Sequence, residues 1–164
     1  MAHSAADLAI KHWNLTPLYY SEEERYGVYP WLYEAAEFTH HRNERVLEVG
    51  CGSGCDLLQF AKHGALATGV DITPKHLDLA RQRVGNLATV LGSDGVNLPF
   101  PDASFDYVYS HGVAHARRPT PENGGGNLPS TPARRTVQCA GVRLYLLFHS
   151  LAFPPAWHEL EAVA

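Results

Sequence analysis

A glycine-rich stretch, Gly50-Cys51-Gly52-Ser53-Gly54, contains the residue types and spacing that most clearly predict chemistry in this sequence. Glycine lacks a Cβ, so its backbone adopts positive φ and lets a bound ligand lie close against the main chain. The spacing is GxGxG, which differs from the GxGxxG of dinucleotide-binding turns. The stretch therefore predicts a ligand-binding turn, and a tight turn that binds nothing is the alternative.

The segments on either side of this turn are a short strand and a helix. Residues 45–49, RVLEV, form a β-branched and apolar run, and residues 56–61 carry apolar residues at helical spacing. Open α/β folds bind nucleotide-like ligands where a strand, a turn and a helix N-terminus meet at the carboxyl edge of a parallel sheet. The predicted fold class is therefore α/β, with a Rossmann-like parallel sheet.

Two carboxylates follow the next two predicted strands. Residues 66–70 predict a second strand that ends at Asp71, where a nucleotide-binding fold places the acid that accepts both ribose hydroxyls. Residues 74–84 predict a helix, residues 88–91 predict a third strand, and Asp94 follows that strand. Both acids are therefore expected at the same edge of the sheet as the glycine turn.

Residues 98–110, LPFPDASFDYVYS, predict a turn-rich loop that leads into a fourth strand. This segment is close to an LPFPDxSFDxVxS pattern. Together with the GxGxG turn and Asp94, it resembles the class I S-adenosylmethionine-dependent methyltransferases of the small-molecule, type 11-like group. The resemblance covers residues 45–115. Ser93 departs from the pattern, because the family usually has glycine at that position.

The resemblance implies a set of contacts to S-adenosylmethionine. The glycine turn and Glu48 would hold the methionine end, since an acidic residue suits a ligand that carries an ammonium and a sulfonium. Asp71 would bind the ribose, and Asp94 would bind the adenine amino group. The implied cofactor-binding residues are Glu48, Gly50, Cys51, Gly52, Gly54, Asp71, Ile72, Asp94, Gly95 and Ser110. No metal ion is implied.

Two histidines, His111 and His115, come directly after the fourth strand, where the transferred methyl group would lie. Either is a candidate general base that would deprotonate the acceptor. Surface or packing histidines are the alternative, because methyl transfer from a sulfonium often needs only in-line positioning. The catalytic residues therefore stay open, and the resemblance implies a small-molecule acceptor without identifying it.

Residues 1–44 precede the first strand and are rich in aromatic residues. Ser21 and Glu24 form a capping-box pattern that predicts a helix start. Pro30 suits the first turn of a second helix, over about residues 31–40. In many class I methyltransferases such a segment closes over the active site; packing of aromatic side chains on the sheet is the alternative. The candidate lid residues are Tyr19, Tyr20, Arg25 and Tyr26.

The composition is that of an ordinary globular chain: 164 residues, 45% hydrophobic, 18% charged, with a formal net charge of -4. This length predicts one domain. The charge gives no electrostatic reason to expect nucleic acid or an anionic membrane as a partner. No apolar run approaches a membrane span, and the first ten residues lack a signal-peptide pattern, so we expect a cytoplasmic protein. The oligomeric state is not predicted.

The character of the chain changes after His115. Residues 116–135 are rich in proline, glycine and arginine and have no apolar periodicity. The codons for residues 125–135, read one nucleotide late, admit AEIYRVLRPGG, with which the family continues, and those for residues 115–117 admit TPD. We therefore expect a frameshift at about residue 115 or 116. Residues 116–164 would then be an irregular, out-of-frame tail.

A shifted frame has a consequence for the fold. The sheet would keep strands 1–4 without strands 5–7, which would leave an unpaired edge on the fourth strand. Residues 143–153, RLYLLFHSLAF, could still form a strand or a helix, since apolar runs also arise by accident.

The sequence thus predicts an N-terminal helical segment at 1–44, an S-adenosylmethionine-binding core at 45–115 and a tail at 116–164. The predicted activity is methyl transfer from S-adenosylmethionine to a small-molecule acceptor. One alternative is a truncated, catalytically inactive fragment that at most binds the cofactor. The other is an NAD-dependent oxidoreductase, which the GxGxG spacing, Glu48 and the loop at Asp94 disfavour.

Overall fold

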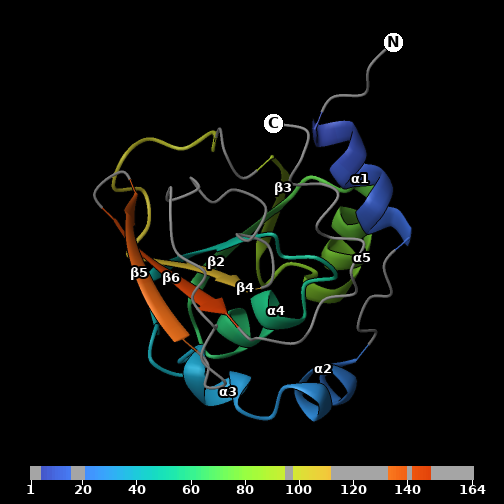
Figure 1. Ribbon diagram of the computed structural model, residues 1–164. Helices are drawn as coiled ribbons and strands as arrows, with labels where there is room; N and C mark the ends of the chain where they lie inside the picture. The colour runs from blue at the N-terminus through green and yellow to red at the C-terminus, as the bar shows by residue number, and fades with distance from the viewer. Residues whose placement is uncertain (1–4, 16–20, 95–97, 112–132, 140–141, 149–164) are drawn as a thin grey trace, which may run out of the picture.

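The computed structural model describes residues 5–15, 21–94, 98–111, 133–139 and 142–148, the last two ranges as backbone only. Three helices come first, helices and strands then alternate from α3 to β3, and the last described elements are strands (Figure 1). The helices are α1 (Ala5–Leu15), α2 (Glu22–Val28), α3 (Leu32–Ala35), α4 (Cys55–Lys62) and α5 (Pro74–Val84). The strands are β1 (Arg45–Val49), β2 (Leu66–Asp71), β3 (Thr89–Gly92), β4 (Tyr107–His111), β5 (Ala133–Cys139) and β6 (Val142–Phe148).

The described strands form one sheet in the order β3-β2-β1-β4-β6-β5. Strand β1 pairs in parallel with both β2 and β4, and β2 pairs in parallel with β3. The chain therefore runs outward from β1 to β3 and then returns to β4 on the other side of β1. The carboxyl end of β1 is the point where the strand order reverses, which is where open α/β sheets bind ligands. The Rossmann-like parallel core over the first four strands is confirmed.

Local signals explain where the helices begin and end. The capping box of α2 is present, because the Glu24 backbone N–H donates to Ser21 Oγ at 3.0 Å and the Ser21 N–H donates to the Glu24 carboxylate at 3.2 Å. The helix expected over residues 31–40 is wrong in length, since α3 ends at Ala35. The reason lies at Glu37, whose φ of 56° is incompatible with a continuing right-handed helix.

Among the described residues, the side chains packed on the two faces of the sheet form clusters of different size. Alternate residues of β1 and β4 point to opposite faces, so Val46 and Tyr109 join one cluster while Leu47 and Val108 join the other. The first cluster is large and contains aromatic rings, among them Phe60 of α4. In the second, the half-buried residues packed on the strands come from the end of β1 and the loop before β4: Val49, Leu98, Phe100 and Phe105.

The described backbone of the C-terminal region extends the sheet. Strand β6 pairs in parallel with β4, in the register Val108↔Leu144, and β5 pairs antiparallel with β6 at the outer edge (Figure 1). The expectation of an unpaired edge on the fourth strand is therefore wrong. A mainly apolar run that includes aromatic residues, such as residues 142–148, suits a strand whatever the origin of its reading frame.

Candidate functional site

The glycine turn lies at the carboxyl end of β1 and has the backbone conformation that its composition predicts. Gly50, Gly52 and Gly54 all have positive φ, at 76°, 52° and 78°. The backbone N–H groups of Gly50 and Cys51 donate to the Val70 carbonyl oxygen at 2.8 and 3.0 Å. The turn is therefore fastened to the end of the neighbouring strand, β2.

Gly54 occupies a position where no other residue fits without movement. A Cβ at this residue would lie 3.1 Å from Ala80 Cα, a backbone atom of α5. Since φ is also positive there, a side chain at this position would be strained on two independent grounds. This close approach places the N-terminus of α4 directly against α5.

Asp71 holds the glycine turn from the end of β2. One carboxylate oxygen accepts the Gly52 N–H at 2.9 Å, and the other accepts the Thr73 N–H at 2.8 Å. His76 Nδ1 lies 3.5 Å from the carboxylate. Burial raises the pKa of Asp71, but the hydrogen bonds from His76, Thr73 and Gly52 outweigh it and lower the pKa below its ordinary value. Asp71 is thus an ionised carboxylate with lone pairs left for further donors.

Asp94 lies close to Asp71 in the fold, beyond the end of β3. In the register of β2 and β3, Asp71 is opposite Gly92, and the Ser93 N–H donates to the Asp71 carbonyl oxygen at 3.0 Å. Asp94 itself is exposed. The two acids that the sequence associates with ribose and adenine therefore stand in succession along the carboxyl edge of the sheet.

Glu48 is buried in the central strand, with only 4% of its surface exposed. The Leu57 backbone N–H donates to its carboxyl group, and Oε2 has no hydrogen-bond partner among the described residues. Burial, followed by the nearby charge of Asp56, raises the pKa of Glu48 well above its ordinary value. The Leu57 contact places the Glu48 carboxyl group against the N-terminal part of α4, which follows the glycine turn.

The remaining implied residues differ in their surroundings. Cys51 is buried, and burial raises the pKa of its thiol well above the ordinary value. Ile72 is half-buried directly after β2. Ser110 Oγ donates to the last carbonyl oxygen of β1 at 2.9 Å, which joins β4 to the start of the turn. Gly95 and His115 lie outside the described residues.

A buried polar network connects α2 with the site, and sequence reasoning did not find it. Arg25 donates two hydrogen bonds to Asp56, at 2.7 and 3.2 Å, and its Nη2 lies 2.8 Å from His111 Nδ1. The hydroxyls of Tyr26 and Tyr109 also donate to Asp56, at 3.0 and 2.8 Å. Burial raises the pKa of Asp56, but the charge and hydrogen bonds of Arg25 outweigh it and lower the pKa. Two of the candidate lid residues thus contact the core.

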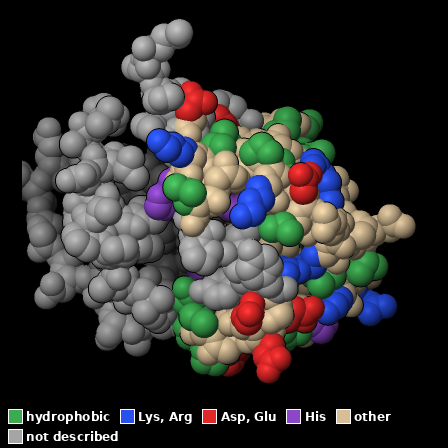
Figure 2. Space-filling view, turned by 90° about the vertical axis from the view of Figure 1, so that its right-hand side faces the viewer, with side chains coloured by type: hydrophobic (Ala, Val, Ile, Leu, Met, Phe, Trp, Pro, Cys, Tyr) green, Lys and Arg blue, Asp and Glu red, His purple; other side chains and the backbone are tan. Residues whose placement is uncertain are grey.

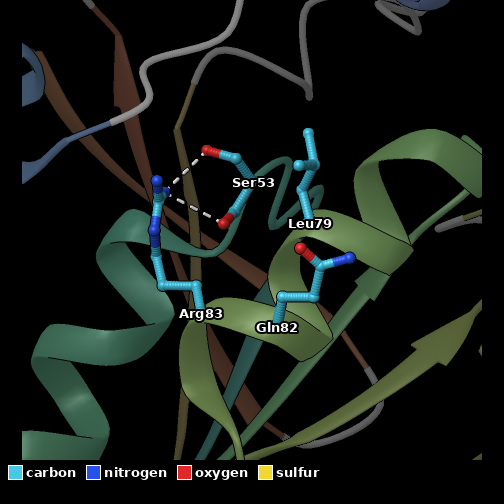
Figure 3. Close-up of a pocket in the computed structure, with 4 residues that line it drawn as sticks. All are labelled: Ser53, Leu79, Gln82 and Arg83. Carbon is cyan, nitrogen blue, oxygen red and sulfur yellow. Dashed lines mark hydrogen bonds between the residues drawn. The ribbon is translucent and has the colours of Figure 1, made fainter.

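A second polar contact reaches the turn from α5. Arg83 Nη1 donates to the carbonyl oxygen of Ser53 at 3.0 Å and to its Oγ at 2.9 Å (Figure 3). A pocket of about 290 Å³ lies beside this contact and is lined by Ser53, Leu79, Gln82 and Arg83. The middle of the glycine turn is therefore held from both sides, by Asp71 and by Arg83.

The surface visible in Figure 2 carries acidic and basic side chains interspersed over its described part, without a large region of one sign. Within the described ranges, every helix falls short of the length and apolar character that crossing a membrane requires.

The fold and the site together define the class of protein. The β3-β2-β1-β4 order, the glycine turn at the point of reversal and the two acids beside it are those of a Rossmann-like domain that binds a nucleotide-type cofactor.

Comparison with known proteins narrows this class. Residues 46–124 match the protein family described as "Methyltransferase domain". The chain is 42% identical over 67 residues to a demethylmenaquinone methyltransferase of Tropheryma whipplei, which covers 40% of this chain and 28% of that protein. It is 37% identical over 70 residues to a malonyl-[acyl-carrier protein] O-methyltransferase of Serratia marcescens. This match covers 43% of this chain and 27% of that protein.

A solved S-adenosylmethionine dependent methyltransferase from Mesorhizobium loti is 28% identical, with a TM-score of 0.48 over 58% of this chain and 42% of that one. The chain spans little more than a quarter of the length of these two curated relatives. Residues 46–124 belong to the methyltransferase-domain family, and the class I recognition from the sequence motifs is confirmed.

Proposed function

We propose that the glycine turn binds S-adenosylmethionine and that the protein transfers its methyl group to a small-molecule acceptor. The observation that carries this proposal is the hydrogen bond from the Gly52 N–H to the Asp71 carboxylate, at the point where the strand order reverses. The turn has the positive φ values that let a ligand approach its backbone, and Asp71 keeps lone pairs for two hydroxyl donors. These residues fit the cofactor.

Each group of residues has a separate task in this proposal. The turn holds the methionine end, Asp71 accepts the ribose hydroxyls and Asp94 accepts the adenine amino group. The bound cofactor supplies an electrophilic methyl group. Ser110 and His111, at the end of β4, border the side from which an acceptor would approach that methyl group. Rate acceleration then comes chiefly from holding the acceptor in line.

The acceptor is proposed only as a class. The relatives named above act on different molecules by their names, demethylmenaquinone in one case and a malonyl group on an acyl-carrier protein in the other. Because these names differ in the acceptor, they support a small-molecule acceptor as a class and do not select a particular one.

We also propose that residues 116–164 are read out of frame. The support is the hidden AEIYRVLRPGG reading over residues 125–135, which begins directly after the family match ends at residue 124. Resequencing the coding DNA across codons 111–137 tests this. A lesion of one inserted or two deleted nucleotides, whose reversal restores TPD and EIYRVLRPGG, would support it. Codons that encode that motif in no frame would refute it.

Calorimetric titration of the full chain with S-adenosylhomocysteine and, separately, with NADH tests the cofactor assignment. Saturable binding of S-adenosylhomocysteine, abolished by Gly54→Ala, is expected. Binding of NADH alone would instead support the oxidoreductase alternative. An inactive fragment would bind S-adenosylhomocysteine but methylate no acceptor in a broad panel.

A further inference from the structure

His111 makes a hydrogen bond whose direction can be assigned from chemistry alone. Its Nδ1 lies 2.8 Å from Nη2 of Arg25. A guanidinium group has donors and no acceptor, so Arg25 must donate and His111 Nδ1 must accept. An imidazolium ring has no acceptor nitrogen. The ring in this contact is therefore neutral, and its proton is on Nε2.

Arg25 is held firmly enough to impose this arrangement. Its guanidinium donates in a fork to both carboxylate oxygens of Asp56, whose side chain is only 2% exposed. Such planar, two-bond pairing fixes the orientation of the guanidinium as well as its position. Tyr26 and Tyr109 donate to the same carboxylate and complete its surroundings. The Nη2 atom that faces His111 is thus part of a rigid network.

The ring of His111 is also held by aromatic neighbours. It meets Tyr29 edge to face at a centroid distance of 5.3 Å and Trp31 at 5.8 Å. The Arg25 guanidinium carbon lies 5.3 Å from the centre of the Tyr29 ring. These contacts come from the segment that joins α2 to α3. The N-terminal helices therefore fix both the proton position and the plane of the imidazole at the end of β4.

We propose that Arg25 is a positioning residue that keeps His111 neutral with its proton on Nε2, so that Nδ1 accepts a hydrogen bond from Arg25 and takes no proton from the methyl acceptor. The existence of that acceptor rests on the proposed function. It replaces the general-base role that the sequence alone left open for His111. The assignment of the proton itself rests only on the Arg25 contact.

The test is nuclear magnetic resonance of the full chain labelled with ¹⁵N in its histidines, recorded without cofactor. The Nε2–H tautomer, the Nδ1–H tautomer and the imidazolium give distinct ring nitrogen signals. The signals that disappear in His111→Gln identify His111. We expect the Nε2–H tautomer in the unchanged protein. Arg25→Lys keeps a hydrogen-bond donor, so we expect it to have a larger share of the Nε2–H tautomer than a variant without a donor.

The variant without a donor is Arg25→Met combined with Asp56→Asn, which removes both charges and keeps an oxygen for the two tyrosine hydroxyls. Unchanged signals of His63, which contacts Tyr33, show that it is folded. We expect its His111 to become a mixture of tautomers. The proposal would be overturned by a proton on Nδ1 or an imidazolium in the unchanged protein. It would also be overturned if the His111 tautomer were the same in the variant that lacks Arg25. Cofactor binding is measured separately, so these outcomes are distinct from failure of the methyltransferase assignment.

Discussion

Arg25 of α2 and Asp56 of α4 form a buried ion pair in which Arg25 Nη2 lies 2.7 Å from Asp56 Oδ2. Asp56 is the second residue of the helix that follows the glycine turn. The pair therefore fastens the N-terminal helices to the element that presents the turn. A change in either residue is expected to affect the fold and the site together.

Removal of one partner tests how much this pair contributes to stability. Asp56→Ala leaves the Arg25 charge buried and two tyrosine hydroxyls without their acceptor, so we expect a loss of about 3–5 kcal/mol in the free energy of unfolding. Urea unfolding measures it. Asp78→Ala is the control, because the Asp78–Arg81 pair is exposed and should contribute less than about 1 kcal/mol. Equal losses in the two variants would contradict the prediction.

Two glycines offer a matched comparison of backbone requirements. Gly54→Ala places a Cβ 3.1 Å from the Ala80 backbone at a positive φ, so we expect about 1–3 kcal/mol of destabilisation and loss of S-adenosylhomocysteine binding. Gly27→Ala meets nothing within 4 Å. In helix α2 it should be neutral or stabilise by up to about 1 kcal/mol. Thermal unfolding with calorimetric titration distinguishes the two.

The charge of Asp71 is expected to matter for the cofactor. Asp71→Asn keeps the size of the side chain but loses charge-assisted acceptance, which contributes about 1.5–3 kcal/mol per hydrogen bond. We therefore expect affinity for S-adenosylhomocysteine to fall about 10- to 100-fold. Asp78→Asn, an exposed acid of α5, should leave the affinity unchanged. An unaltered affinity in Asp71→Asn would remove this residue from the cofactor site.

Glu48 gives a prediction about pH. Its folded-state pKa is raised by burial, so the folded protein binds more protons than the unfolded chain above the ordinary value of 4.5. Stability contributed by this group therefore falls as pH rises from 4.5 toward the raised value. In Glu48→Gln the group no longer titrates, so the variant should gain melting temperature relative to the unchanged protein as pH rises. A difference that is constant across pH would contradict this.

Short-range patterns were sufficient to predict the central elements. The strand at 45–49, the positive φ of the glycines and the helix start at Ser21 each depend on neighbouring residues, and all are confirmed. The end of α3 depends on the φ of Glu37, which no local sequence signal announces, since glutamate seldom adopts a positive φ. Helix α1 was not predicted either; its contact with the core includes His76 Nε2, 3.1 Å from the Trp13 carbonyl oxygen.

The network around Asp56 could not be predicted for a different reason. Its partners Arg25 and Tyr109 lie 31 and 53 residues away in sequence, and neither spacing corresponds to a helix or hairpin contact. Only the packing of α2 on the sheet brings these residues together. In the same way, the pairing of β6 with β4 depends on which segment reaches an open edge, and edge strands accept many sequences.

The hydrogen bond between the Gly52 N–H and the Asp71 carboxylate also has a kinetic consequence. Because folding has already fixed the turn, its conformational entropy is lost before any cofactor arrives, and binding need not order it again. Association should then proceed without a slow rearrangement of the turn. Variants of the turn that keep it ordered should therefore differ in how long the cofactor stays bound, with similar rates of capture.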